Sequence, residues 1–340
     1  MVIGIRTFVY ICDLNTMEQV GKQDNFSLRD GKMLYDKGFG EVIDWLCSRD
    51  NIHKGKDMPG IITASGKAWR EQRRFALKHL KDFGFGKSSM EHQIADEVKE
   101  LLDNLKIKIK EGEHEVPMVH IFNLPVVNSL WKIIANQRLD LNHPKEKQKI
   151  ADLAEMFTSF GVTGLLMLIL FRIPFWLAKK IPHIIKIRNL YCSLFNWFRE
   201  EYDKHEKTLD QDHPRDFMDA YIMERQRANE ENNQESSFFG TDGEANFIHS
   251  MFDLFLAGSE TTSTTLIFAI LLMLHDSRPF KKAQKELDGV VGRSRLPCLD
   301  DRPNLPYFEA LMAELMRRAN VAPFAVFHMT EKEGMIAGHM

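Results

Sequence analysis

The sequence predicts a mainly α protein that folds as a single domain over residues 1–340. Apolar residues recur at helical spacing through most of the chain. A stretch from Asp242 to about Leu274 is apolar enough and long enough to form a helix that crosses the whole domain. No alternation of strands with helices and no internal duplication is evident, which argues against an α/β fold.

The first predicted elements are short. Residues 1–12 favour a small strand, because polar residues and a glycine interrupt them too often for a signal sequence or a membrane span. Asn15 and Glu18 have the spacing of a capping box, which predicts a short helix that ends before Asp24. Helical periodicity then predicts helices over residues 36–48, 67–80, 90–110, 124–136, 146–160, 184–207 and 214–229, and a later one that starts near residue 306.

The stretch 230–243 separates these helices from the long central one. It is rich in Asn, Gln, Ser and Gly, which predicts an exposed loop. Asp242 has the side chain of a helix N-cap, so we expect it to begin the long helix.

Composition sets broad limits on function. The chain has 44% hydrophobic and 27% charged residues, as expected for a globular protein with a large core, and its net charge of -3 gives no reason to expect a nucleic-acid partner. Lysines and arginines cluster over 70–81 and 179–188, so a local anion or a membrane surface remains possible. The four cysteines are far apart, which argues against a disulfide scaffold or a zinc site; they are Cys12, Cys47, Cys192 and Cys298.

An aromatic and basic segment follows the apolar run 165–171. Phe175, Trp176, Lys179 and Lys180 all lie between Pro174 and Pro182. This mixture is typical of a segment that lies in a membrane interface without crossing it. A buried core segment fits the same residues equally well.

The most informative stretch is a small, hydroxylic and acidic island in the long apolar helix, with the sequence Ala257-Gly258-Ser259-Glu260-Thr261-Thr262. Burying its polar side chains costs free energy unless each finds a partner. We expect the Thr261 hydroxyl to bond the Ala257 carbonyl and to bend or open the helix. An opened turn leaves room for a small ligand beside a hydroxyl and a carboxylate that can move protons.

Two simpler interpretations of this helix exist. A membrane span is excluded, because the stretch 258–265 is nearly all polar or small and would lie at mid-bilayer. A core helix whose hydroxyls bond their own backbone stays open as an alternative.

Two further pairs of residues have the spacing of neighbours on one helix face. Trp69 and Arg73 share a helix face, where an indole N–H and a guanidinium could bind one carboxylate or phosphate, although a solvated basic face is the simpler interpretation. Glu314 and Arg317 are three apart and can pair along a helix, but such pairs are common and weak when exposed.

Taken in order, these motifs resemble the cytochromes P450, the haem-thiolate monooxygenases. The wording is most like the microsomal family-2 type in the segments W-R-E-Q-R-R-F, D-F-G-F-G-K, H-P-R-D-F-M-D-A-Y, F-L-A-G-S-E-T-T, D-R-P-N-L-P-Y and E-x-x-R. The resemblance implies the P450 fold and a haem b cofactor. It also implies hydroxylation of lipophilic small molecules with O₂, an NADPH-dependent diflavin reductase as electron donor, and contact with the endoplasmic reticulum membrane.

The resemblance also implies roles for single residues. Thr261 and Glu260 match the proton-delivering pair of the family. The residues matched to the haem pocket are Trp69, Arg73 and His328 at the propionates and Ala257 and Gly258 in the groove over the haem. Glu314 and Arg317 match a buried ion pair of the family that stabilises the fold rather than taking part in catalysis.

The chain departs from the family pattern at both ends. The Cys-ligand loop F-x-x-G-x-R-x-C-x-G does not follow the E-x-x-R helix, and Cys298 precedes that helix outside any such motif, so no metal ligand is assigned. The membrane anchor and proline-rich hinge are also missing, so the predicted fold is incomplete and the chain as given is expected in the cytoplasm or peripherally on the membrane.

Three explanations stay open: a partial copy of a working monooxygenase, a truncated and inactive product that acts at most as an interaction partner, or haem binding through another ligand. We expect the isolated chain to lack monooxygenase activity.

Overall fold

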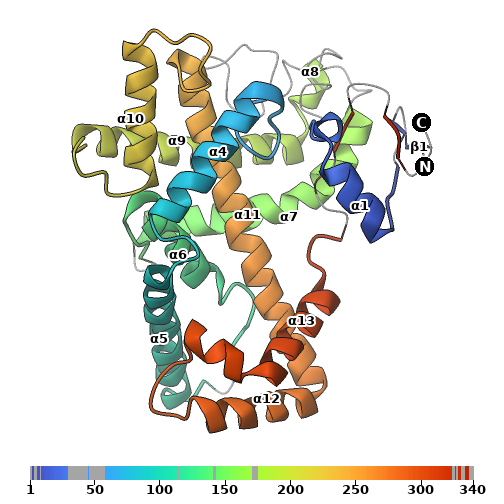
Figure 1. Ribbon diagram of the computed structural model, residues 1–340, viewed down its shortest axis with the longest axis vertical. Coiled ribbons are helices and arrows are strands. Elements are labelled where there is room, and N and C mark those ends of the chain that lie inside the picture. Colours follow the sequence, from blue (N-terminus) through green and yellow to red (C-terminus); the bar gives the residue numbers. More distant parts are fainter. Residues whose placement is uncertain are drawn as a thin grey trace.

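The computed structural model describes residues 2–3, 6–7, 9–29, 45, 58–113, 115–140, 143–170, 175–323, 326, 328–330 and 334–336. Most of the helix predicted over 36–48 lies outside these residues. The described part is mainly helical, which confirms the predicted fold class (Figure 1).

A small β piece stands at the start, where β1 (Val2–Ile3) pairs with β2 (Arg6–Thr7) antiparallel and Val2 lies opposite Thr7. The helices before the long one are α1 (Leu14–Gly21), η1 (Asp24–Phe26), α4 (Gly66–Asp82), α5 (Ser88–Lys110), α6 (Asn123–Ala135), α7 (Pro144–Leu170), α8 (Phe175–Ala178), α9 (Pro182–Lys207) and α10 (Phe217–Glu230). The long helix α11 (Gly240–His275) is followed by α12 (Ser277–Val290), η3 (Leu299–Asn304) and α13 (Pro306–Ala319).

Three predicted boundaries are wrong. Helix α1 is capped by Asp13 rather than Asn15, because the Asp13 carboxylate accepts hydrogen bonds from the Thr16 amide at 2.7 Å and from its hydroxyl at 2.6 Å. Helix α11 begins at Gly240 after Phe239, so Asp242 lies inside the first turn. Helix α7 continues to Leu170, ten residues past the predicted end, because the leucines and the methionine that follow residue 164 are good helix formers.

The connection from α10 to α11 changes character along its length. Residues 231–235 are exposed, and the chain then turns inward so that Ser237 and Phe238 are buried. The Ser237 carbonyl accepts a hydrogen bond from the Asn246 side chain at 3.0 Å, and the Ser237 hydroxyl accepts one from Gln72 of α4 at 3.0 Å. This inward end therefore ties α4 to the first turns of α11.

Helix α11 runs through the centre of the molecule and packs against α6, α7, α9, α10, α12 and α13 (Figure 1). The densest packing lies around its first half. Trp131 of α6 has its ring centroid 4.8 Å from both Trp197 of α9 and Phe255 of α11, and both Trp131 and Phe255 are fully buried. Aromatic contacts of this kind stabilise a core beyond the area they bury.

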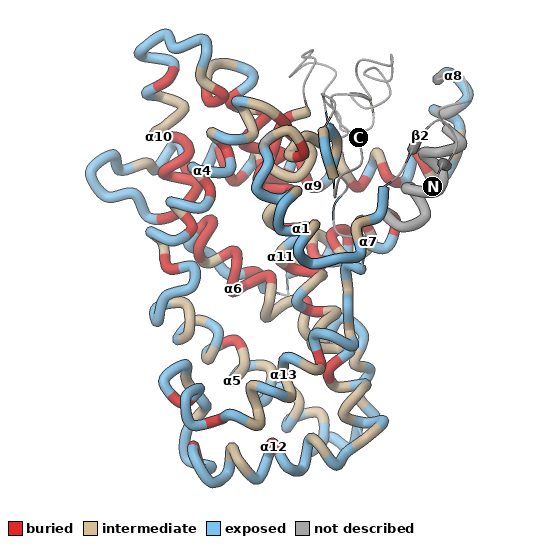
Figure 2. Tube along the Cα trace, turned by 45° about the vertical axis from the view of Figure 1, so that its right-hand side comes forward, coloured by how far each residue is buried: buried red, intermediate tan, exposed pale blue. Residues whose placement is uncertain are grey.

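The second half of α11 lies in the more exposed lower part of the molecule, with α12 and α13 (Figure 2). In the described part of the chain, α11 is the helix long and apolar enough to cross a membrane by length and composition. Its first half is a core helix of the domain, with Phe247 and Met251 fully buried.

Segment 58–63, before α4, is fixed to α11 by two buried side chains. The Asn246 side-chain oxygen accepts from the Gly60 amide at 3.0 Å, and the Asp253 carboxylate accepts from the Ile61 and Ile62 amides at 2.6 and 2.8 Å. Gly60 has φ +96°, and a Cβ there would lie 2.6 Å from Asp253 Oδ2, so glycine is required at this position. These contacts set the position of α4 relative to the island on α11.

Candidate functional site

The hydroxyl groups of the island bond their own helix. The Thr261 hydroxyl donates to the Ala257 carbonyl at 2.5 Å, as the sequence predicts. Ser259 and Ser263 donate in the same way to Phe255 and Ser259, at 2.7 and 2.8 Å. Residues 257–262 nevertheless remain α-helical throughout, so the predicted opening of the helix is wrong. The hydroxyls are satisfied by carbonyls that keep their backbone bonds, which removes the need for a break.

The island presents different residues to different sides of α11. Ala257 is exposed and Thr261 is partly exposed. Gly258 instead lies against α6, where an added Cβ would be 2.9 Å from Leu130 Cδ2. The absent side chain at Gly258 is therefore explained by the close approach of α11 to α6, whereas Ala257 and Thr261 form the open side.

Glu260 is the buried acid of the island, with 6% of its surface exposed. Its Oε1 accepts a hydrogen bond from the Asn123 side-chain amide at 2.9 Å. The same amide nitrogen lies 3.2 Å from His120 Nδ1. Burial raises the pKa of Glu260, and the charge of a protonated His120 lowers it to a smaller extent. The pKa of Glu260 therefore lies closer to neutral pH than that of an exposed glutamate.

Trp69 and Arg73 lie on the same face of α4, as their spacing predicts. The Arg73 guanidinium carbon is 5.8 Å from the centre of the Trp69 ring, within cation–π distance. Arg73 is exposed, and no carboxylate pairs with it among the described residues. A cation left without an anion in this way is suited to bind one from outside the chain.

His328 is placed by the start of the chain. Its Nδ1 lies 2.8 Å from the Phe26 carbonyl, and the neighbouring Met329 amide donates to the Leu28 carbonyl at 2.8 Å. A ring nitrogen that faces a carbonyl must donate, so Nδ1 carries a proton and Nε2 is the atom left to meet a ligand.

Glu314 and Arg317 form the predicted ion pair, but the pair is not buried. Two guanidinium nitrogens of Arg317 donate to the carboxylate at 2.7 and 2.8 Å, and Arg318 adds a third bond at 2.7 Å. Hydrogen bonds from Arg317 and Arg318 hold the pKa of Glu314 down to about 2. The side chains are 42% and 69% exposed, because no described segment covers this face of α13. The expectation of a buried pair is therefore wrong here.

Cys298 takes part in local structure. Its amide donates to Asp301 Oδ2 at 2.8 Å and its thiol lies 3.3 Å from the same oxygen, at the start of η3. Arg295 holds that carboxylate through bonds of 2.6 and 2.7 Å. Of the other described cysteines, Cys12 is exposed and Cys192 lies on α9.

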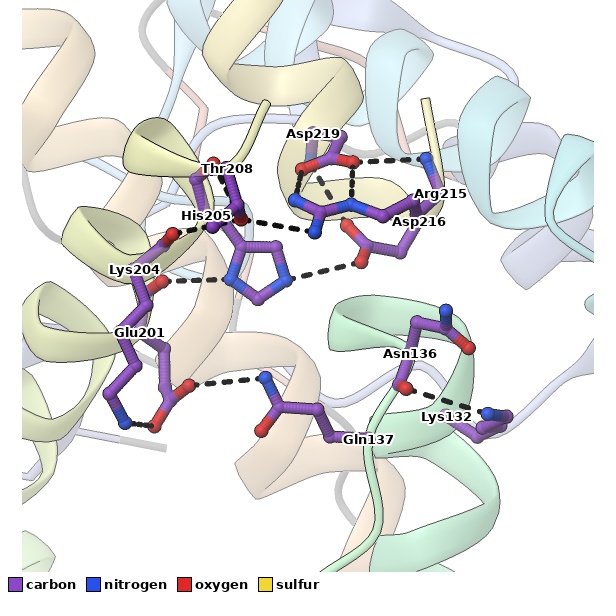
Figure 3. Close-up of polar contacts among 10 residues, drawn as sticks. All are labelled: Lys132, Asn136, Gln137, Glu201, Lys204, His205, Thr208, Arg215, Asp216 and Asp219. Carbon is purple, nitrogen blue, oxygen red and sulfur yellow. Dashed lines mark hydrogen bonds and ion pairs between the residues drawn. The ribbon is translucent and has the colours of Figure 1, made fainter. Parts of the chain in front are cut away.

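A buried polar cluster at the junction of α9 and α10 was not predicted from the sequence (Figure 3). His205 Nδ1 lies 2.8 Å from the Glu201 carbonyl and Nε2 lies 3.1 Å from the Asp216 carboxylate, so both nitrogens face acceptors. The ring can satisfy both only as an imidazolium. The available signal was the segment H-P-R-D-F-M-D, which holds Arg215, Asp216 and Asp219.

This cluster could be mistaken for a metal site. Ligand atoms of His205, Asp216 and Asp219 lie within 4.8 Å of one another, and all three residues are buried. Arg215, however, donates to both oxygens of Asp219 at 2.6 and 2.8 Å, and the Asp219 amide occupies the second oxygen of Asp216 at 2.9 Å. The groups satisfy one another, and the cluster stabilises the junction between the two helices.

Comparison with known proteins agrees with the fold and with the motifs. The family model described as Cytochrome P450 matches residues 1–340. Cytochrome P450 2B19 of Mus musculus is 34% identical over 342 residues, which cover 99% of this chain and 63% of the relative. Cytochrome P450 2L1 of Panulirus argus is 30% identical over 345 residues, covering 99% of this chain and 64% of the relative.

A solved structure of a zebra fish cytochrome P450 with progesterone shares the fold, with a TM-score of 0.75 and 23% sequence identity over 97% of this chain and 69% of that one. The chain therefore belongs to the cytochrome P450 family, with similarity to its family-2 members, and by homology its class is that of the P450 monooxygenases. It spans less than two thirds of the length of these curated relatives.

Proposed function

We propose that this chain carries the oxygen-side wall and the anion-binding helix of a haem-dependent monooxygenase, which hydroxylates lipophilic small molecules with O₂. The observation that carries the proposal is the partly exposed Thr261 hydroxyl on the open side of α11, one residue along the helix from the buried Glu260 carboxyl. A hydroxyl that accepts and donates hydrogen bonds, on the same helix turn as an acid with a raised pKa, is suited to take part in proton delivery.

The residues fit a haem in part. When bound, haem supplies the iron that activates O₂ in this family. Arg73 is an exposed cation free of carboxylates among the described residues, and Trp69 lies beside it with an indole N–H, so together they would hold a propionate. His328 would donate to a propionate through Nε2 only as an imidazolium, because its Nδ1 already donates to the Phe26 carbonyl, and Ala257 leaves the wall of α11 open.

The iron ligand does not fit. None of the described cysteines stands in the family's ligand loop, and Cys298 is engaged with Asp301. No step through the iron is therefore derived for this chain. Its own residues bind an anion at α4 and hold or move a proton at Glu260 and Thr261.

Two surfaces support the partners that we propose. The outer face of α4 presents a row of exposed cations suited to an acidic, NADPH-dependent diflavin reductase; these are Arg70, Arg74, Lys78 and Lys81. At α8, Trp176 is 64% exposed and Leu177 41%, with Lys180 5.8 Å from the Trp176 ring. Exposed aromatic and basic side chains of this kind favour the interface of a membrane, and a full-length protein would lie at the endoplasmic reticulum.

The first test of this proposal is haem retention. Purified Arg73→Ala protein is expected to keep less haem than wild type, whereas Lys81→Ala, an exposed cation of the same helix, is expected to keep the wild-type amount. Absorbance at the Soret band per mole of protein measures this. Equal haem content in both variants would contradict the proposed propionate contact.

The second candidate function is an inactive P450-derived protein that acts as an interaction partner. The observation that favours it is the exposed apolar side of the second half of α11, where Leu271 is 57% exposed and Leu274 76%. The two candidates differ in the reduced, carbon-monoxide-bound difference spectrum. A thiolate-haem band would support the monooxygenase, and its absence would favour the interaction partner.

A further inference from the structure

We propose that Asn123 and His120 are positioning residues for Glu260: Asn123 fixes the carboxyl group, and His120 couples it to the surface of the molecule. The inference rests on the proposed function, because it concerns the acid of the proposed proton-delivering pair. Neither residue lies in any of the sequence motifs described above.

The contact is specific in geometry. Asn123 is the first residue of α6 and is 3% exposed, and its amide nitrogen carries two hydrogens. One hydrogen is directed to Glu260 Oε1 at 2.9 Å and the other to His120 Nδ1 at 3.2 Å. In this arrangement His120 Nδ1 accepts, so the ring proton of neutral His120 sits on Nε2.

The Asn123 amide, as placed, favours the ionised form of Glu260, because it donates to the carboxylate. Its oxygen Oδ1 is buried and has no hydrogen-bond partner among the described residues.

The backbone brings His120 to this place. His120 has φ 64°, in the left-handed region that few residues other than glycine and asparagine adopt, and its carbonyl accepts from the Asn123 amide at 3.1 Å. The imidazole is exposed and is therefore in contact with water. Among the described residues, His120 is the titratable group that acts on Glu260, and the side chain bonded to the acid is the neutral amide of Asn123.

The test is the titration of Glu260 in the purified chain, followed through ¹³C-labelled glutamate side chains and assigned with Glu260→Gln. Asn123→Ala removes a hydrogen bond to the carboxylate, so the pKa of Glu260 is expected to rise, with a several-fold gain in proton affinity. His120→Asn keeps a residue that tolerates the left-handed backbone but removes the charge that lowers the pKa of Glu260, so the same pKa is expected to rise. The control is His213→Asn, at an exposed histidine between α9 and α10, which should leave the titration unchanged.

The outcomes separate this inference from the proposed function, because the titration requires no haem. Wild-type titration of Glu260 in both Asn123→Ala and His120→Asn would overturn the inference, and so would an equal shift in His213→Asn. If Asn123→Ala fails to fold by circular dichroism, the exposed His120→Asn decides alone. If the chain binds no haem but shows the expected pKa shifts, the positioning role of Asn123 and His120 is supported and the proposed function is contradicted.

Discussion

The two halves of α11 are equally apolar in sequence and differ sharply in burial. In the first half, Phe247, Met251 and Phe255 are fully buried among α6, α9 and α10. In the second half, Phe268 is 39% exposed and Leu274 76%. The difference shows that apolar periodicity reports which face of a helix is suited to burial, and that only packing partners decide whether it is buried.

Two ion pairs show the same contrast in burial. The carboxylate of Asp219 is fully buried and bound by Arg215, whereas that of Glu314 is 42% exposed and bound by Arg317. Both pairs are bidentate, and their partners are three or four residues apart along the chain. The sequence offers no local sign of which pair is buried, because burial depends on segments far away along the chain.

The largest effect is expected from truncating the packed half of α11. Phe255→Ala should lower the free energy of unfolding by about 3–5 kcal/mol, because it opens a cavity beside Trp131, Trp197 and Phe198. Leu274→Ala, on the same helix, should change it by no more than about 0.5 kcal/mol, since this side chain is already exposed. Urea unfolding followed by far-ultraviolet circular dichroism measures both. Similar losses in the two variants would mean that the second half of α11 is packed in solution.

An intermediate effect is expected at the ion pairs. Arg215→Met strands the buried Asp219 carboxylate and should cost about 3 kcal/mol in the same unfolding measurement. Arg317→Met is the matched control and should cost nothing measurable, because Glu314 is exposed and keeps its bond from Arg318. A comparable loss at Arg317 would show that this face of α13 is covered in solution.

The fold was predictable where the signal is local. Helical periodicity located the long α11 and the helices around it. The cap at Asp13 was missed because Asn15 nearby could also serve, and the start of α11 was missed because Phe239 makes no side-chain cap bond that a sequence pattern could reveal. The Thr261 bond to Ala257 was predictable, since both partners lie one turn apart on one helix. The partners of Glu260 were not, because Asn123 and His120 lie 137 and 140 positions earlier and only the docking of α6 on α11 brings them there.

The smallest effect is expected from pH at the junction of α9 and α10. Burial lowers the pKa of His205, and the hydrogen bond and charge of Asp216 raise it by more, so the folded-state pKa lies above the ordinary value of 6.5. The stability from this contact is therefore fully present below pH 6.5 and is lost as the pH rises through the higher folded-state pKa. His205→Gln should cost about 1.5–3 kcal/mol at pH 5.5, through lost charge-assisted bonds, and less at pH 9.

The matched control for this effect is His213, whose ring is 85% exposed and lies 3.4 Å from Asp210. It is also a histidine beside an aspartate, but water screens the pair, so His213→Gln should leave the free energy of unfolding unchanged at either pH. Urea titrations of wild type and both variants at pH 5.5 and 9 give the comparison. A cost at His205 that stays constant with pH would show that the ring is neutral in the folded state, which would leave one of its two acceptors, the Glu201 carbonyl or the Asp216 carboxylate, without a proton.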